Sequence, residues 1–94
     1  MTVATDMELF SDEEWTLLTR DLRLTPRQAE IIRHITHGLS DKQIARQLEI
    51  SVPTVRTHMA RLFTKFELSD RLELLVLVFA SLREYWKKDE SPLS

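Results

Sequence analysis

The most informative segment of the chain covers residues 40–66 and reads SDKQIARQLEISVPTVRTHMARLFTKF. Its apolar spacing predicts two short helices joined by a tight turn. The second helix, within residues 51–66, contains the cations Arg56, Arg61 and Lys65 and no acid. A cationic helix presented by a partner helix is the usual arrangement for reading the major groove of DNA. The segment therefore predicts a helix-turn-helix that binds DNA.

Positive charge is concentrated in the middle of the chain, although the net charge of the whole is −2. Residues 1–24 hold two Lys/Arg against six acids, residues 25–67 hold seven against four, and residues 68–94 hold four against five. The central block is therefore electropositive, whereas phosphate would repel the first 24 residues.

The composition indicates one small all-helical domain. Ninety-four residues suffice for a single modest core, and one glycine without alternating Val/Ile runs favours helices. The absence of cysteine excludes disulfides and thiolate metal sites, which suits a reducing cytoplasm. No basic region precedes an apolar stretch at the N-terminus, and the longest apolar run, residues 74–80, is too short to span a bilayer. We therefore expect a cytoplasmic protein without a signal peptide.

Helix starts are marked by hydroxyl side chains, three of them followed three residues later by Glu or Gln as in a capping box. We expect caps at Ser11, Thr25, Ser40, Ser51 and Ser69, prolines in first turns at Pro26 and Pro53, and a left-handed residue at Gly38. The last helix is expected to run to about Lys87, and the first ten residues are expected to be loose. Five helices with short connections indicate no second domain.

The last predicted helix is apolar nearly all round. One stripe comprises Leu72, Leu75, Val76, Phe79, Leu82 and Trp86, and another comprises Leu74, Leu77, Val78 and Tyr85. A helix at the edge of a small domain needs only one buried stripe, so the second requires another cover. Two alternatives stay open and are compatible: cover within the chain by Trp15, Leu18 and Leu22, and a dimer seam.

The spaced residues resemble the LuxR/FixJ-type helix-turn-helix DNA-binding domain over residues 24–86. The matching positions are Leu24-Thr25-Pro26-Arg27-Gln28, Gly38-Leu39-Ser40, Ile44-Ala45, Leu48, Ile50-Ser51, Thr54-Val55-Arg56, His58, Leu62, Lys65-Phe66 and Ser69-Asp70-Arg71. The resemblance implies a four-helix domain, residues 24–87, whose third helix enters the major groove and whose fourth serves dimerisation. An extension with one extra amphipathic helix, residues 1–23, precedes it, and a polar tail, residues 88–94, follows. Because family members usually carry a receiver or sensor domain and only about 24 residues precede the match here, a free-standing form is expected.

Two residues depart from the family pattern, in which glycine is frequent where this chain has Glu49 and Glu67. A glutamate at positive φ costs on the order of 1 kcal/mol. Either these turns adopt negative φ or some stability is lost. Both acids should also reduce non-specific affinity for DNA.

The resemblance, together with helical spacing, also assigns candidate contacts. Base edges would be met by Arg56, Thr57, Ala60 and Arg61, because arginine can grip guanine and the methyl groups of Thr and Ala can contact thymine. Phosphates would be met by Lys42, Arg46, Ser51, Thr54, His58 and Lys65. A merely solvated face is the alternative for every one of these cations and for Arg56 and Arg61, and packing is the alternative for His58. The dimer or partner interface would comprise Leu74, Leu75, Val78, Phe79, Leu82, Tyr85 and Trp86.

No catalytic or metal site is predicted. His34 and His37 lie three residues apart, but no cysteine or acid cluster joins them, so we interpret them as solvated histidines and expect no metal and no cofactor. The chain also lacks a nucleophile–base frame and a phosphate-binding glycine loop, so an enzyme is not expected.

The leading hypothesis is a sequence-specific transcriptional regulator that binds double-stranded DNA as a homodimer, with residues 52–66 in the major groove. The alternative is an anti-activator that pairs with a larger LuxR-type regulator and blocks its DNA binding. The acidic first segment and the two glutamates favour this alternative, and the salt dependence of DNA binding would distinguish the two. Region 4 of a sigma factor, a third possibility, explains His58 and Ser69-Asp70-Arg71 less well.

Overall fold

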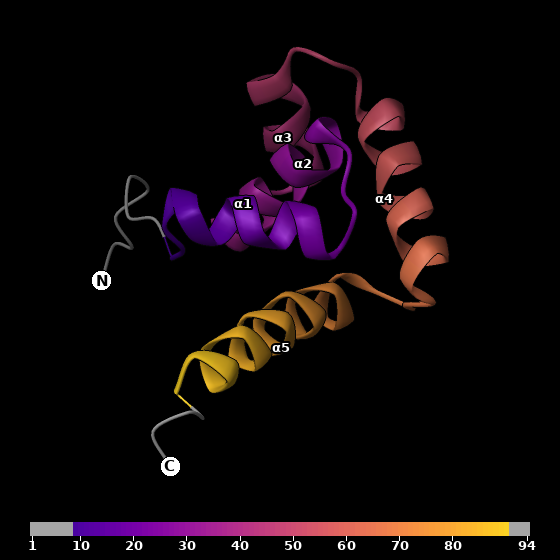
Figure 1. Ribbon diagram of the computed structural model, residues 1–94. Helices are drawn as coiled ribbons and strands as arrows, with labels where there is room; N and C mark the ends of the chain where they lie inside the picture. The colour runs from indigo at the N-terminus through magenta and orange to yellow at the C-terminus, as the bar shows by residue number, and fades with distance from the viewer. Residues whose placement is uncertain (1–8, 91–94) are drawn as a thin grey trace, which may run out of the picture.

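The computed structural model describes residues 9–90 and contains, in that range, five helices and no strand. The helices are α1 (Asp12–Asp21), α2 (Pro26–Thr36), α3 (Asp41–Leu48), α4 (Val52–Phe66) and α5 (Arg71–Glu90), shown in Figure 1. The all-α prediction with one extra N-terminal helix is confirmed. None of these helices is long and apolar enough to cross a membrane.

The first four helices begin where the sequence places their caps. Complete capping boxes join Ser11 with Glu14, Thr25 with Gln28, and Ser40 with Gln43. The hydroxyl of Ser51 accepts the backbone N–H of Thr54 and caps α4. Each cap satisfies backbone donors that a helix start leaves unpaired. Local sequence therefore sets these four boundaries.

The last helix differs from the prediction at both ends. It begins at Arg71, because the carboxylate of Asp70, one residue after Ser69, accepts the N–H of Glu73 at 2.9 Å. It runs to Glu90, past the expected Lys87, so residues 88–90 belong to the helix and not to the polar tail.

The first four helices end in the same way, with a left-handed residue followed by a backbone bond across six residues. The left-handed residues are Arg23, Gly38, Glu49 and Glu67, with φ of 53°, 79°, 56° and 55°. The closing bonds run from Leu24 to Thr19, Leu39 to His34, Ile50 to Ala45 and Leu68 to Phe63. Of the two alternatives for Glu49 and Glu67, the structure takes positive φ. The left-handed Arg23 was not anticipated.

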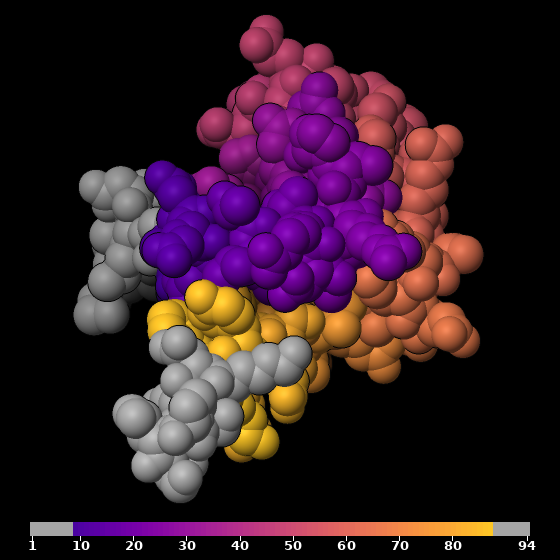
Figure 2. Space-filling model, viewed as in Figure 1, coloured from indigo at the N-terminus to yellow at the C-terminus, as the bar shows by residue number. Residues whose placement is uncertain are grey.

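One core joins all five helices. Its buried members are Phe10, Trp15, Leu18, Leu24, Ile31, Ile32, Ile35, Ile44, Ala45, Val55, Met59, Leu62, Leu74, Val78 and Leu82. Helix α1 contacts both α2 and α5, and Figures 1 and 2 show it lying next to α5. The expected cover within the chain is therefore present: Trp15 and Leu18 are buried, while Leu22 is partly buried against the same core.

Phe10 corrects the expectation of a loose N-terminus. Residues 1–8 lie outside the described residues, but Phe10 is only 6% exposed. Its ring makes edge-on contacts with Trp15 at 5.4 Å and with Phe79 at 5.2 Å between centroids. The staple predicted between Phe10 and Trp15 is formed, and it also links α1 to α5.

Candidate DNA interface

Helices α3 and α4 form a helix-turn-helix whose second helix has one buried and one exposed face. Val55, Met59 and Leu62 of α4 are buried, and α4 contacts both α2 and α3. The opposite face is exposed and comprises Thr54, Arg56, Thr57, Ala60, Arg61 and Thr64. Burial of one apolar stripe thus orients the polar stripe outward.

The four candidate base contacts lie together on this exposed face. Arg56, Thr57, Ala60 and Arg61 follow the i, i+1, i+4, i+5 spacing of one helical face. The hydroxyl of Thr57 donates to the backbone oxygen of Pro53 at 3.0 Å, so its methyl group remains for an apolar contact. Two guanidinium groups and two methyl groups on one helical face match the chemistry that reads base edges in the major groove.

Two candidate phosphate contacts surround the first turn of α4. The hydroxyls of Ser51 and Thr54 lie 2.8 Å apart, and the Ser51 oxygen accepts the Thr54 N–H at 3.2 Å. A helix N-terminus carries partial positive charge and favours a phosphate. Lys42 and Arg46 are exposed one turn apart on α3. These four residues are accessible to a DNA backbone.

Lys65 and His58 are placed differently from the other candidates. The ammonium of Lys65 donates to the backbone oxygen of Arg23 in the α1–α2 connection, and it lies 5.4 Å from the ring centroid of Phe66. It thereby helps to satisfy the end of α1, while Lys65 itself is exposed on α4 one turn beyond Arg61. His58 is half-buried on α4.

The sequence did not predict a carboxylate that lies beside the exposed face of α4, which we call the reading face. Asp41, the first residue of α3, lies 3.5 Å from Nε of Arg56 through its Oδ2. Its Oδ1 lies 2.5 Å from Nη2 of Arg71, whose Nη1 donates to the backbone oxygen of Leu39 at 2.9 Å. The sequence separations of 15 and 30 residues give no local signal for these pairs.

The expected interface on α5 needs correction. Leu74, Val78 and Leu82 are buried in the core of the single chain, so they cannot also form a surface for a partner in this conformation. Leu75 and Tyr85 are half-buried. The exposed apolar residues are Leu72, Val76, Phe79 and Trp86, with exposures of 68%, 59%, 48% and 47%. We call these four residues the α5 stripe. Leu72 and Val76 were absent from the expected interface.

A small polar hollow lies at the end of α2. Its volume is about 430 Å³, and it is lined by His34, His37, Leu39, Gln43, Arg46 and Gln47. Burial lowers the pKa of His34, and the nearby His37 and Arg33 lower it further against the opposing effect of Glu30. Among residues 9–87 no group of three His, Cys, Asp or Glu side chains is arranged to hold a metal ion.

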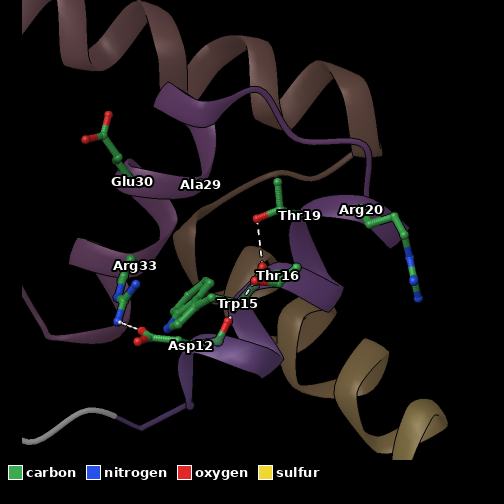
Figure 3. Close-up of a pocket in the computed structure, with 8 residues that line it drawn as sticks. All are labelled: Asp12, Trp15, Thr16, Thr19, Arg20, Ala29, Glu30 and Arg33. Carbon is green, nitrogen blue, oxygen red and sulfur yellow. Dashed lines mark hydrogen bonds and ion pairs between the residues drawn. The ribbon is translucent and has the colours of Figure 1, made fainter.

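A second hollow, of about 550 Å³, separates the surfaces of α1 and α2 and is shown in Figure 3. Arg33 of α2 bridges it, with Nη2 3.0 Å from Oδ1 of Asp12 and its guanidinium carbon 5.5 Å from the Trp15 ring centroid. The hydroxyl of Thr19 donates to the backbone oxygen of Trp15 at 2.7 Å. The contacts of Arg33 tie α1 to the helix-turn-helix domain.

Comparison with known proteins agrees with this geometry. The model of the luxR family of bacterial regulatory proteins matches residues 22–78. Over 52 residues the chain is 46% identical to the monoamine regulon transcriptional regulator of Klebsiella aerogenes, covering 55% of this chain and 23% of that protein. Over 56 residues it is 41% identical to the nitrate/nitrite response regulator NarL of Escherichia coli K12, covering 60% of this chain and 26% of NarL.

A third relative, the nitrate/nitrite response regulator homolog of Haemophilus influenzae, is 43% identical over 60 residues, which cover 64% of this chain and 29% of that protein. The matching segments thus span about a quarter of the relatives' lengths. No solved structure matches. The family is one of DNA-binding regulators and not of enzymes, in line with the prediction. The chain belongs to the LuxR family of bacterial regulatory proteins and carries its helix-turn-helix DNA-binding domain.

Proposed function

We propose that this chain binds a two-fold related DNA site as a homodimer and reads each half-site with α4. The observation that supports this most directly is the exposed face of α4, where Arg56, Thr57, Ala60 and Arg61 lie together without an acid on the helix. Arginine forks recognise guanine O6 and N7, and the methyl groups fit thymine. The names of the relatives, which are transcriptional and response regulators, support a role in transcription.

Positioning on the duplex would come from the N-terminus of α4 and from α3. Ser51 and Thr54 border the positive end of α4, and Lys42 and Arg46 extend the positive surface along α3. Such contacts fix the register of a protein on DNA without reading its sequence. Pairing through the α5 stripe would present two copies of α4 to half-sites about 34 Å apart.

The experiment begins with selection of bound sequences from random DNA, followed by mobility-shift titration of the selected site. Arg56→Ala and Arg61→Ala should each weaken specific binding by about 5- to 150-fold, since a forked base contact contributes about 1–3 kcal/mol. Circular dichroism should show an unchanged fold, because both side chains are exposed. The matched control is Arg20→Ala, which removes the same charge from an exposed position on α1 and should leave specific binding intact.

Unchanged specific binding by both Arg56→Ala and Arg61→Ala would contradict the proposal.

The anti-activator role is the second candidate function. It is favoured by the exposed glutamates on either side of α4, Glu49 and Glu67, and by the α5 stripe. A DNA reader should lose affinity steeply as salt rises from low to moderate concentration. An anti-activator would show little affinity for DNA at any salt concentration and would instead form a complex with a larger LuxR-type regulator.

A further inference from the structure

The carboxylate of Asp41 lies between arginines from two other helices. It contacts Nε of Arg56 on α4 with one oxygen and Nη2 of Arg71 on α5 with the other, at 3.5 Å and 2.5 Å. Asp41 is the first residue of α3, directly after the N-cap Ser40 and within the capping box that joins Ser40 and Gln43, so its backbone position is fixed locally. Three helix segments far apart in sequence thus meet at one carboxylate beside the reading face.

The contact with Arg56 restricts where that guanidinium can point. Arginine has several rotatable bonds and five donors, and a free arginine beside DNA can reach either a base edge or a phosphate. When Nε donates to a carboxylate, the two terminal nitrogens remain for a forked contact with a base. The charge of Asp41 also repels phosphate, so it disfavours backbone contacts in its vicinity.

Arg71 holds the carboxylate in place from the other side. Its Nη1 donates to the backbone oxygen of Leu39 at 2.9 Å, while its Nη2 contacts Asp41. A planar guanidinium with two fixed partners is oriented far better than one with a single partner. Asp41, Arg56 and Arg71 also line the same surface hollow of about 420 Å³, together with Met59 and Asp70. Of the two carboxylates that line it, Asp41 is the one that contacts Arg56.

We propose that Asp41 is a specificity-determining residue that acts through Arg56, holding its guanidinium toward base edges and away from phosphates. The proposal rests on the function proposed above, in which Arg56 reads a base. Asp41 itself does not contact DNA and is a positioning residue. Loss of its contact with Arg56 should change the ratio of specific to non-specific affinity more than it changes the stability of the fold, because the Arg56 side chain is 67% exposed and an ion pair to such a side chain contributes little stability.

The test is Asp41→Asn in the full chain, titrated against the selected site and against unrelated DNA. The amide has one oxygen for two arginines, so with Arg71 engaged its NH₂ group faces Arg56 and the holding contact is lost. The specific-to-non-specific ratio should fall by about three- to tenfold, the range of one ordinary intramolecular hydrogen bond. Non-specific affinity should rise, and its salt slope should increase by about one as Arg56 becomes free to contact a phosphate.

The matched control is Glu49→Gln, which makes the same change of charge at the exposed turn between α3 and α4. It should raise specific and non-specific affinity alike and leave their ratio unchanged. Circular dichroism and urea unfolding verify the fold of each variant. Asp41→Ser, whose hydroxyl is tolerated in a first helical turn, provides a second variant and should lower the ratio in the same direction.

A double variant identifies the route. If Asp41 acts through Arg56, then Asp41→Asn should cause no further loss of the ratio in an Arg56→Ala background. Losses that add would overturn the inference, because they would place the action of Asp41 elsewhere. A ratio that is unchanged in Asp41→Asn but lowered in Arg56→Ala would overturn the inference about Asp41 and would leave the proposed reading role of Arg56 standing. A ratio unchanged in Arg56→Ala would overturn the reading role of Arg56 and the inference with it.

Discussion

At the scale of single residues, the left-handed helix ends are the features with the clearest energetic consequence. Glu49 and Glu67 hold φ of 56° and 55° and are both exposed. A residue with a Cβ pays about 1 kcal/mol for this conformation, whereas glycine adopts it freely. We expect Glu49→Gly and Glu67→Gly each to raise the free energy of unfolding by up to about 1 kcal/mol, after the entropy that glycine adds to the unfolded chain. Urea denaturation measures the change.

Alanine at the same positions separates the backbone effect from the loss of charge. Glu49→Ala and Glu67→Ala remove the same carboxylates but keep a Cβ, so neither should gain stability. The two glycine variants should therefore be more stable than the alanine variants. Equal stabilities within each pair would mean that positive φ carries no cost here.

At the scale of the helices, α1 is an integral part of the fold although the family match begins only at residue 22. Leu18 of α1 is buried in the core that includes Leu74, Val78 and Leu82 of α5. We expect Leu18→Ala to lower the free energy of unfolding by about 2–5 kcal/mol, the range for a leucine removed from a close-packed core. Leu17→Ala, at a half-buried neighbouring position, is the control and should cost clearly less. Equal costs in urea denaturation would show that α1 is an accessory segment.

The helices also differ in how much of their structure could be predicted from the sequence. Hydroxyl caps, three of them with Glu or Gln three residues on, are local signals, and they placed the starts of α1 to α4 correctly. The predicted interface on α5 was partly wrong, because a helix that is apolar nearly all round has no sequence pattern that shows which face is buried. Its packing against α1 determines that Leu74, Val78 and Leu82 face inward.

The candidate site shows the same limit. The exposed face of α4 follows from helical periodicity, so Arg56, Thr57, Ala60 and Arg61 could be grouped from sequence. The contacts of Asp41 with Arg56 and Arg71, and of Lys65 with the backbone of Arg23, join residues 15 to 42 positions apart. Such pairs depend on how the helices pack, and no local pattern announces them.

At the scale of the whole molecule, one small domain carries two distinct surfaces, an electropositive one and the apolar α5 stripe. The overall charge of −2 limits general attraction to DNA, so recognition must rely on the central electropositive block. Leu72, Val76, Phe79 and Trp86 recur at the three- and four-residue spacing of a helix–helix seam, with Arg83 at the one position between them that is not apolar. A second copy that covers this stripe would double the electropositive surface presented to DNA.

Substitution of Val76 tests this assembly. Val76 is 59% exposed within the chain, so Val76→Glu should leave the fold intact but place a carboxylate in the proposed seam, where an unpaired charge is strongly unfavourable. We expect the dimer dissociation constant to rise by at least about tenfold, as measured by sedimentation equilibrium, and binding to a two-fold site to weaken with it. Gln47→Glu adds the same charge to an exposed position on α3 and should leave assembly unchanged. A Val76→Glu protein that dimerises as the original chain does would exclude the α5 stripe from the interface.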